Sequence, residues 1–441
     1  MRYFGTDGIR GAYGGEFINE DFFGRLGSAV AVRLLGKISG RRPRVAVAGD
    51  TRFSSESLKA AFCGGLRGVD VVDFGTVPTP ALAFGVLDTA SDWGVMVTAS
   101  HNPSSDNGIK FFDSKALKAD DESQSEIERL FDAGAVPHGG AVSVEKLDMK
   151  SRYVSKMASV LPANSLAGLR IALDCANGAT AGISGEVLRR LGAEVFEIGV
   201  SPDGRNINDG VGSEHTERLS ALVAEKGAGL GLAHDGDGDR LVVCGADAKQ
   251  IPGECVLGLI ALEAKRAGTL SGGGIVTTLQ SNTGLDKAME SAGIRVYRSG
   301  IGDRLVMRMM LEKGCSIGGE NSGHYIFTEV SPCGDGLAAA LKFLSTLWAS
   351  GMGVSEVAGI VPLRPSLSKA VKVARKVPLE STETLAYAVR SCEARLEGSG
   401  RVLVRYSGTE NKIRLLLESE DASLLGPMMD ELLKSVENDL Q

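Results

Sequence analysis

The chain has 441 residues, roughly three times a typical domain of about 150 residues, so it is long enough to hold several domains. Hydrophobic residues make up 43% and charged residues 23% of the sequence, which is ordinary globular usage and excludes extended disorder. The formal net charge of −7 argues against nucleic acid or an anionic membrane as a partner, but it is compatible with a local basic pocket for a small phosphate.

A strand, a polar loop, a helix and a second strand follow one another in this order three times along the chain. The first copy predicts a strand over residues 44–49, a helix that Ser54 and Ser55 can cap and that runs to about residue 67, and a strand over residues 69–75. The other two copies predict strand pairs over residues 170–174 and 193–199 and over residues 274–278 and 294–297. Strands connected through a helix form parallel βαβ units, so the pattern predicts three similarly built α/β domains.

The last part of the chain has a different pattern, which begins after a linker with Pro362 and Pro365. Its predicted elements are a strand over residues 370–375, a helix to about residue 397 with Ser381 or Thr382 as its cap, strands over residues 400–405 and 412–418, and a helix over residues 423–436. This succession predicts a separate antiparallel α+β unit.

The seven cysteines are scattered, odd in number and without a Cys-x-x-Cys spacing, so we expect reduced, mostly buried thiols in a cytoplasmic protein. The first residues lack the apolar segment of a signal peptide, and no apolar run of about 18 residues indicates a transmembrane helix. We therefore expect no membrane partner.

A serine–histidine pair follows an apolar strand predicted over residues 93–97. Ser100 and His101 then lie at the end of a parallel strand, where open α/β sheets place their sites. The pair is compatible with a nucleophile and its base, with a phosphorylated serine, or with an ordinary turn. Lys110 is either a cation for this site or a surface charge.

Residues 235–240 alternate aspartate and glycine between two apolar strands, so that Asp235, Asp237 and Asp239 can point to one place. Such hard oxygen ligands suit Mg²⁺ or Ca²⁺. At a separation of about 5 Å and an effective dielectric constant of about 20, each pair of carboxylates repels by about 3 kcal/mol, which a bound cation would offset. An EF-hand is excluded because Arg240 stands where its loop needs glycine. A solvated acidic turn is the alternative.

Two further loops carry hydrogen-bonding groups. Residues 318–324 combine carboxylate, amide, hydroxyl and imidazole groups, which suit a polyhydroxylated ligand, although His324 can equally be structural. Residues 405–411 and Arg414 are compatible with a phosphate clamp or with a plain hairpin turn. Arg10 lies in a loop of small residues near the start of the chain.

Taken in order, these motifs resemble those of the α-D-phosphohexomutase family, and of its glucosamine branch in particular, over essentially the whole chain. The resemblance rests on residues 4–11 at the start, 99–103 as the phosphoserine loop, 235–240 as the metal loop, 319–324 as the sugar-binding loop and 405–409 as the phosphate-binding loop. Residues 206–208 and 212–213 are also similar to the glucosamine branch.

The resemblance implies an α/β fold of three similar mixed domains, with parallel βαβ-containing sheets flanked by helices, and a C-terminal α+β domain, all around a central cleft. We expect the domain ranges 1–148, 149–248, 249–362 and 363–441. The implied activity is the Mg²⁺-dependent interconversion of glucosamine 6-phosphate and glucosamine 1-phosphate, in the route to UDP-N-acetylglucosamine. A hexose or hexosamine 1,6-bisphosphate is implied as activator and intermediate. The implied partners are sugar phosphates, with the chain as a monomer or homodimer.

The resemblance also implies a role for each matched residue. Ser100 is implied as the phosphorylated residue and, with Asp235, Asp237 and Asp239, as a metal ligand. The implied groups for charge stabilisation or proton transfer are Arg10, His101, Lys110, Arg240 and His324. The implied sugar-binding residues are Glu320, Asn321 and Ser322, and the implied phosphate-binding residues are Arg405, Ser407, Gly408, Thr409 and Arg414.

The sequence departs from the family pattern in three places. Asn321 stands where the glucosamine branch usually has glutamine, His234 stands where an apolar residue is common, and Asn411 and Lys412 follow where proline is usual. Since Asn321 lies in the sugar-binding loop, a phosphomannomutase or phosphoglucomutase is the alternative enzyme. A non-catalytic sugar-phosphate-binding protein is the alternative of another class, but the serine and all three aspartates are present.

Overall fold

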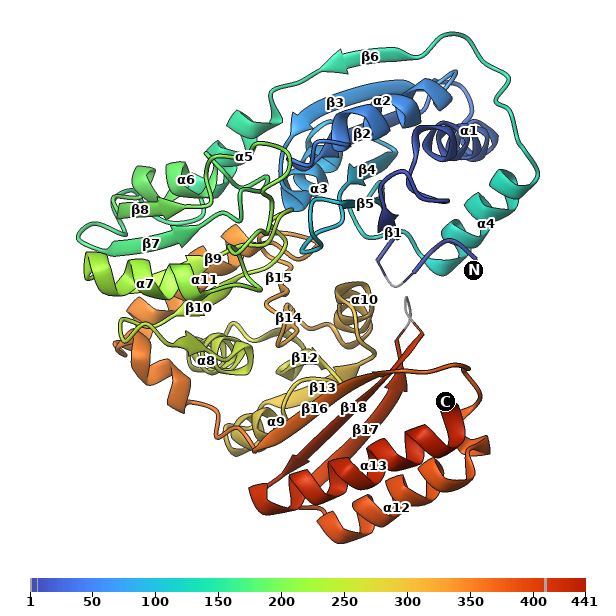
Figure 1. Cartoon of the computed structure of the whole chain (residues 1–441). Helices are drawn as coiled ribbons and strands as arrows, with labels where there is room; N and C mark the ends of the chain where they lie inside the picture. The colour runs from blue at the N-terminus through green and yellow to red at the C-terminus, as the bar shows by residue number, and fades with distance from the viewer. Residues whose placement is uncertain (1, 6, 408–410) are drawn as a thin grey trace. The chain divides into compact units, whose positions relative to one another are not determined.

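The computed structural model describes residues 2–5, 7–407 and 411–441. The chain divides into two compact units. The first spans Met1–Leu279 and Tyr297–Ile360, and the second spans Gln280–Val296 and Val361–Gln441 (Figure 1). No helix in the described part of the chain has both the length and the apolar character needed to cross a membrane.

The first sheet of the first unit is mixed, with the strand order β1-β5-β4-β2-β3-β6. Its strands are β1 (Ile9–Ala12), β2 (Arg44–Gly49), β3 (Asp70–Thr76), β4 (Trp93–Val97), β5 (Asp106–Asp113) and β6 (Ser143–Lys146). Its helices are α1 (Glu20–Lys37), α2 (Ser55–Gly65), α3 (Thr79–Asp88) and α4 (Asp121–Asp132). β2 runs parallel to β3 and β4, which confirms the first predicted βαβ unit, and β5 is antiparallel to β4. Phe23, Leu58 and Phe62 bury the apolar faces of α1 and α2.

The second sheet has the order β11-β10-β9-β7-β8. Its strands are β7 (Arg170–Asp174), β8 (Glu194–Ile198), β9 (Leu230–Ala233), β10 (Val242–Cys244) and β11 (Gln250–Ile251), with helices α5 (Met149–Ala158), α6 (Ser184–Arg190) and α7 (Glu217–Lys226). β7 is parallel to β8 and β9, as the second copy predicts, whereas β10 is antiparallel to β9. The reversal between β9 and β10 is where the aspartate-rich loop lies.

The third sheet has the order β13-β12-β14-β15. Its strands are β12 (Gly274–Thr278), β13 (Arg295–Ser299), β14 (Ile317–Gly319) and β15 (Tyr325–Phe327). The helices of this part of the chain are α8 (Gly253–Arg266), α9 (Gly284–Ser291), α10 (Asp303–Lys313) and α11 (Gly336–Ser350). β12 and β14 are parallel, and β14 and β15 are antiparallel.

The C-terminal sheet of the second unit is fully antiparallel, in the order β16-β18-β17. It consists of β16 (Ser366–Lys372), β17 (Gly400–Tyr406) and β18 (Lys412–Ser419), and helices α12 (Glu383–Leu396) and α13 (Leu425–Leu440) lie side by side (Figure 1). The predicted α+β unit is thus confirmed, but its first strand begins four residues earlier than predicted. Its first residues are polar and largely exposed, so the alternation of apolar residues did not mark them.

Two predicted helix caps, Ser54 and Thr382, do not form the hydrogen bond of a cap. Ser54 and Thr382 do precede α2 and α12, but neither side chain accepts a hydrogen bond from the helix. The Ser54 hydroxyl accepts from Asn107 Nδ2 instead, and Thr382 Oγ1 donates to the carbonyl of Leu379. A tertiary contact thus takes the place of capping at Ser54, and a local contact to the preceding turn takes its place at Thr382.

The first and second sheets are joined by hydrogen bonds between their loops. The amide of Thr79 donates to the carbonyl of Asp237 at 2.8 Å, and Thr51 Oγ1 donates to the carbonyl of Asn177 at 2.7 Å. The amide of Phe53 also donates to the carbonyl of Gly204 at 2.9 Å. We call this set of contacts the domain I–II seam, where domain I contains the first sheet and domain II the second.

A buried carboxyl, Asp335, begins α11: its Oδ1 accepts from the amide of Ala338 at 2.9 Å and from the hydroxyl of Tyr153 at 2.8 Å. Burial raises the pKa of Asp335 to about 6. Because this value lies above the ordinary 3.8, the folded chain binds the proton more tightly than the unfolded chain. The contribution of Asp335 to stability is therefore complete below pH 4 and is lost as the pH rises through about 6.

We expect Asp335→Asn to remove this pH dependence while it keeps a helix-capping oxygen. The free energy of unfolding of the unmodified chain should fall, relative to that of the variant, by about 1 kcal/mol between pH 5 and pH 7. Urea denaturation at both pH values measures the difference. Asp148→Asn, at the exposed cap of α5, is the matched control and should show no such change. If the free energy of unfolding changed equally with pH in Asp335→Asn and in the unmodified chain, the pH dependence could not be assigned to Asp335.

Candidate active site

Most of the sequence-predicted residues of the first unit meet at the ends of three strands. Ser100 follows β4, the aspartate-rich loop follows β9, and Glu320 follows β14. Lys110 reaches the same place from β5. A hydroxyl, carboxylates and cations from the ends of these strands thus lie together in one buried centre.

Ser100 lies against the aspartate-rich loop. Its hydroxyl donates to Asp235 Oδ2 at 2.6 Å, and the residue is 1% exposed. Its backbone has a φ of +54°, a left-handed conformation that is uncommon for a residue with a Cβ. Such strain persists only where the surroundings enforce it, and it is typical of functional sites.

His101 lies between Ser100 and Arg240. Its Nδ1 lies 3.4 Å from Ser100 Oγ and accepts a hydrogen bond from Arg240 Nη2 at 2.8 Å. Burial, together with the charge of Arg240, lowers the pKa of His101 to about 3. The imidazole is therefore neutral at pH 7, which fits an acceptor near the serine better than a cation.

Asp235, Asp237 and Asp239 are buried, and one ligand atom from each lies within 4.8 Å of the others. Burial, and the repulsion from the other two carboxylates, raise the pKa of Asp235 to about 7. Asp237 Oδ1 is buried and has no hydrogen-bond partner, which is costly for a carboxylate oxygen. Three hard oxygen donors with an unsatisfied atom among them fit a divalent metal ion.

Lys110 supplies positive charge inside this cluster and is not a surface lysine. Its Nζ lies 2.7 Å from Asp237 Oδ2 and 2.9 Å from Asp239 Oδ2. Burial by itself would lower the pKa of Lys110, but Asp237, Asp239 and Asp7 raise it well above its usual range. Thr79 Oγ1 donates to the same oxygen of Asp237 at 2.6 Å.

His324 and Arg240 flank the cluster. His324 Nε2 lies 3.1 Å from Asp239 Oδ1, and His324 Nδ1 lies 3.4 Å from Glu320 Oε2. Burial opposes the charged form, but Asp239 raises the pKa of His324 to about 10, so the ring is an imidazolium. Arg240 Nη1 forms an ion pair with Glu214 Oε1 at 2.6 Å.

The sugar-loop residues differ in exposure. Glu320 is buried and its Oε1 accepts from the amide of Gly302 at 3.0 Å, whereas Asn321 and Ser322 are exposed. Ser322 Oγ lies 3.2 Å from His324 Nδ1. The loop therefore combines a fixed carboxylate with accessible polar groups.

Arg10 reaches the centre through a residue that the motif analysis did not single out. Its Nη2 lies 2.6 Å from Asp7 Oδ2, and Asp7 also contacts Lys110 at 3.2 Å and Lys118 at 2.5 Å. Thr79, Glu214 and Lys118 were missed because each is an isolated polar residue that only the fold brings to the motifs. Asp7 lies within the opening motif, residues 4–11, but no role was assigned to it.

The predicted phosphate residues lie in the second unit. Arg405 of β17 and Arg414 of β18 are cross-strand partners, so two guanidinium groups lie close together on one sheet. Arg405 Nη2 donates to Gln280 Oε1 at 3.4 Å, and Ser407 is buried. Gly408 and Thr409 lie outside the described residues.

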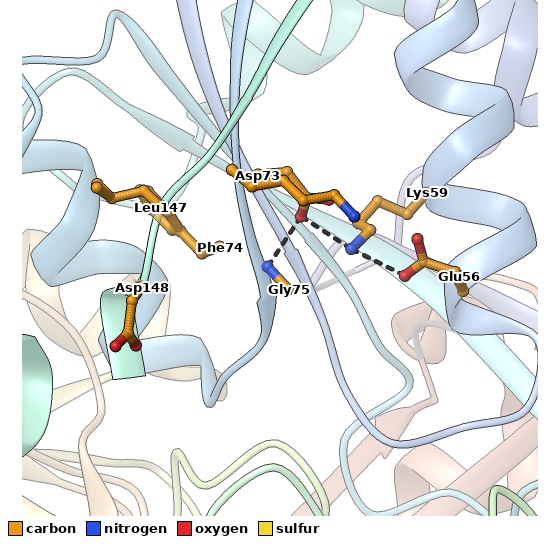
Figure 2. A pocket seen from close by; sticks show the side chains of 8 residues that line it. Glu56, Lys59, Asp73, Phe74, Gly75, Leu147 and Asp148 are labelled. Carbon is orange, nitrogen blue, oxygen red and sulfur yellow. Dashed lines mark hydrogen bonds and ion pairs between the residues drawn. The ribbon is translucent and has the colours of Figure 1, made fainter. Parts of the chain in front are cut away.

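A surface hollow of about 290 Å³ on the first sheet is not a comparable site (Figure 2). Lys59 Nζ donates to Asp73 Oδ1 at 2.8 Å and lies 3.0 Å from Glu56 Oε2. The same Asp73 oxygen accepts from the amide of Gly75 at 2.9 Å (Figure 2). Lys59 is thus already paired with two carboxylates and is not free to hold an anionic ligand.

Comparison with known proteins decides the family. Residues 1–136, 151–248 and 252–362 match the phosphoglucomutase/phosphomannomutase alpha/beta/alpha domains I, II and III, and residues 369–435 match the C-terminal domain. The chain belongs to the phosphoglucomutase/phosphomannomutase family. It is thus a member of the α-D-phosphohexomutases, as its motifs predict, and its three α/β sheets and C-terminal α+β unit match that fold.

Two relatives in this family cover the chain almost completely. The phosphoglucosamine mutase of Thermobifida fusca is 40% identical over 100% of this chain and 99% of the relative. That of Leifsonia xyli is 41% identical over 98% of this chain and 97% of the relative. Among solved structures, a phosphoglucomutase/phosphomannomutase family protein from Burkholderia thailandensis has a TM-score of 0.82 at 25% identity, and covers 98% of this chain and 96% of that one.

Proposed function

We propose that the chain interconverts glucosamine 6-phosphate and glucosamine 1-phosphate through a phosphorylated Ser100 and a bisphosphorylated sugar. The observation that carries the proposal is the 2.6 Å contact between Ser100 Oγ and Asp235 in a buried carboxylate cluster with an unsatisfied oxygen. Relatives at 40% and 41% identity are named for this activity, which favours glucosamine over other sugars.

The chemistry is phosphoryl transfer in both directions. The bond between phosphorus and Ser100 Oγ breaks, a bond from phosphorus to a sugar hydroxyl oxygen forms, the hydroxyl proton passes to a basic group of the site, and the departing Ser100 Oγ takes up a proton to become the serine hydroxyl again. The resulting bisphosphate turns around, and its other phosphoryl group returns to Ser100. The substrate thereby becomes its isomer, and the phosphoserine is regenerated.

Each residue has a distinct part in this proposal. Asp235, Asp237, Asp239 and the phosphorylated Ser100 would hold Mg²⁺, which when bound neutralises charge on the transferring group. Lys110 and Arg240 stabilise the same charge. Neutral His101 accepts a hydrogen bond from Arg240 and holds this arginine beside Ser100, and the His324 imidazolium and Arg10 are charge-stabilising groups. Glu320, Asn321 and Ser322 bind sugar hydroxyls.

The second unit binds the phosphate that does not react. Arg405, Ser407, Gly408, Thr409 and Arg414 form this clamp in the proposal, and it accepts a phosphate at either end of the sugar. A hexose or hexosamine 1,6-bisphosphate phosphorylates Ser100 and is also the intermediate. We place the enzyme in the cytoplasm, as a monomer or homodimer, with sugar phosphates as its partners.

A competition assay tests the choice of sugar. Glucosamine, glucose and mannose 6-phosphates are supplied together at equal concentration with a trace of glucose 1,6-bisphosphate, and the three 1-phosphates are measured. We expect glucosamine 1-phosphate to form fastest. Faster formation of the mannose or glucose product would assign the chain to the alternative, a phosphomannomutase or phosphoglucomutase, and binding without any product would indicate a non-catalytic protein.

We expect Arg405→Ala to raise KM for both phosphate isomers. A charge-assisted contact is worth about 1.5–3 kcal/mol, which corresponds to about 10- to 150-fold. Steady-state assays in both directions measure the effect. Arg395→Ala, on α12 in the same unit, removes an exposed ion pair with Glu431 and is the matched control. A loss confined to one isomer would contradict a shared clamp.

A further inference from the structure

The loop that carries Ser100 encloses a buried arginine that no motif singled out. The side chains of Arg52 and Asp50 are fully buried and form an ion pair at 2.8 Å. Arg52 Nη2 donates to the carbonyls of Ser100 at 2.9 Å and Asn102 at 2.8 Å. Arg52 Nη1 donates to the carbonyl of Asp106 at 2.9 Å and to that of Pro103.

All five N–H groups of this guanidinium therefore have acceptors: one on Asp50 and four on backbone carbonyls of the loop. Four carbonyl dipoles that converge on one point repel one another unless a cation lies between them. A lysine has three donors on a single atom and cannot reach four carbonyls in the plane of a guanidinium. The shape of the loop thus depends on this arginine.

Asp50 connects the arginine to the rest of the loop. Its Oδ2 also accepts from Thr98 Oγ1 at 2.7 Å, and the same Thr98 Oγ1 accepts from the amide of Ser100 at 2.9 Å. From the second sheet, Asn208 Nδ2 donates to the carbonyl of Ser100 at 2.9 Å. The backbone amide and the backbone carbonyl of Ser100 are both held by hydrogen bonds, which accounts for its left-handed φ.

We infer that Arg52 is the positioning residue that sets the direction of Ser100 Oγ toward Asp235. This inference rests on the proposed role of Ser100 in phosphoryl transfer. In-line transfer depends on the position of the donor oxygen, and a displacement of about 1 Å can reduce the rate about 10²-fold. Arg52 contacts neither the substrate nor the reacting atoms in this role, so its loss affects the rate of transfer more than substrate binding.

The test compares Arg52→Met and Arg52→Lys with the same changes at Arg33. Arg33 is also buried in the first domain, where it binds Glu126 and Ser123 and stacks on Trp93, away from the loop. We expect kcat to fall about 100-fold in Arg52→Met with KM changed less than about threefold, and no rescue by lysine. The Arg33 variants should lose thermal stability but keep kcat within about threefold.

A second measurement does not depend on turnover. The chain is incubated with glucose 1,6-bisphosphate, and the rate at which Ser100 gains phosphate is followed by intact-mass spectrometry. This rate should fall in parallel with kcat. If Arg52→Met does not fold, Arg52→Lys decides the test, since lysine keeps a positive charge beside Asp50 but cannot reach all four carbonyls of the loop.

Normal phosphorylation and kcat in folded Arg52→Met, or in Arg52→Lys where the methionine variant does not fold, would overturn the inference. An equal loss of kcat in the Arg33 variants would do so as well, because the effect would then be general destabilisation. Failure of the proposed function is distinct: the unmodified chain would itself neither gain phosphate on Ser100 nor convert sugar phosphates.

Discussion

Ser100→Ala should reduce isomerisation on the order of 10⁴-fold or more while the chain stays folded and still binds sugar phosphate. The hydroxyl is the only part of Ser100 that accepts the phosphoryl group, and alanine fits the same backbone conformation as serine. Coupled assays in both directions measure turnover, and peptide mass spectrometry locates the phosphate. Ser105→Ala, at an exposed position of the same loop, is the matched control.

Two results would contradict this assignment. One is near-normal turnover of Ser100→Ala. The other is a stable phosphate on a different residue of the active protein, since the proposed transfer begins and ends at Ser100 Oγ.

Asp237→Asn should weaken Mg²⁺ binding and reduce turnover by roughly 10²- to 10³-fold without unfolding the chain. Asparagine keeps an oxygen for Thr79 but removes the negative charge that a divalent ion needs. Lys110 remains paired with Asp239, so the buried cations stay compensated. Calorimetric titration with Mg²⁺ measures binding, circular dichroism reports the fold, and exposed Asp247→Asn is the matched control.

Chelation provides an independent check of the same site. EDTA should abolish turnover of the unmodified chain, and added Mg²⁺ should restore it. Full activity in EDTA would show that the carboxylate cluster serves another purpose, with Lys110 as its permanent counterion.

Much of the fold could be predicted because its signals are local. Apolar strands that end in glycine or polar residues, such as those over residues 44–49 and 170–174, have their partners nearby in the sequence. Strand β16 was placed too late because its exposed start has no apolar alternation. Ser54 did not cap its helix because its hydroxyl bonds to Asn107, a tertiary partner, and Thr382 did not because its hydroxyl bonds to the carbonyl of Leu379 in the preceding turn.

The residues of the candidate site likewise fall into those that a local sequence motif indicates and those that only the fold brings together. The serine, the three aspartates and the sugar loop are contiguous motifs, so the sequence alone indicates them. Lys110 looked like a surface lysine until the fold buried it among Asp237 and Asp239. Arg52 and Glu214 belong to no motif that the sequence analysis could use. The groups that they bind are backbone carbonyls or side chains distant in the sequence.

The domain I–II seam has a consequence for how the intermediate can turn around. Ser100, the phosphate donor in the proposed mechanism, lies on one side of the seam and the aspartate-rich loop on the other, and Thr79, Thr51 and Phe53 bond across it. Separating the two sides would break these bonds and bring water to the carboxylate of Asp237. In the proposed mechanism these bonds keep the donor serine and the metal ligands together, so the sugar rotates while the seam stays closed between the two half-reactions.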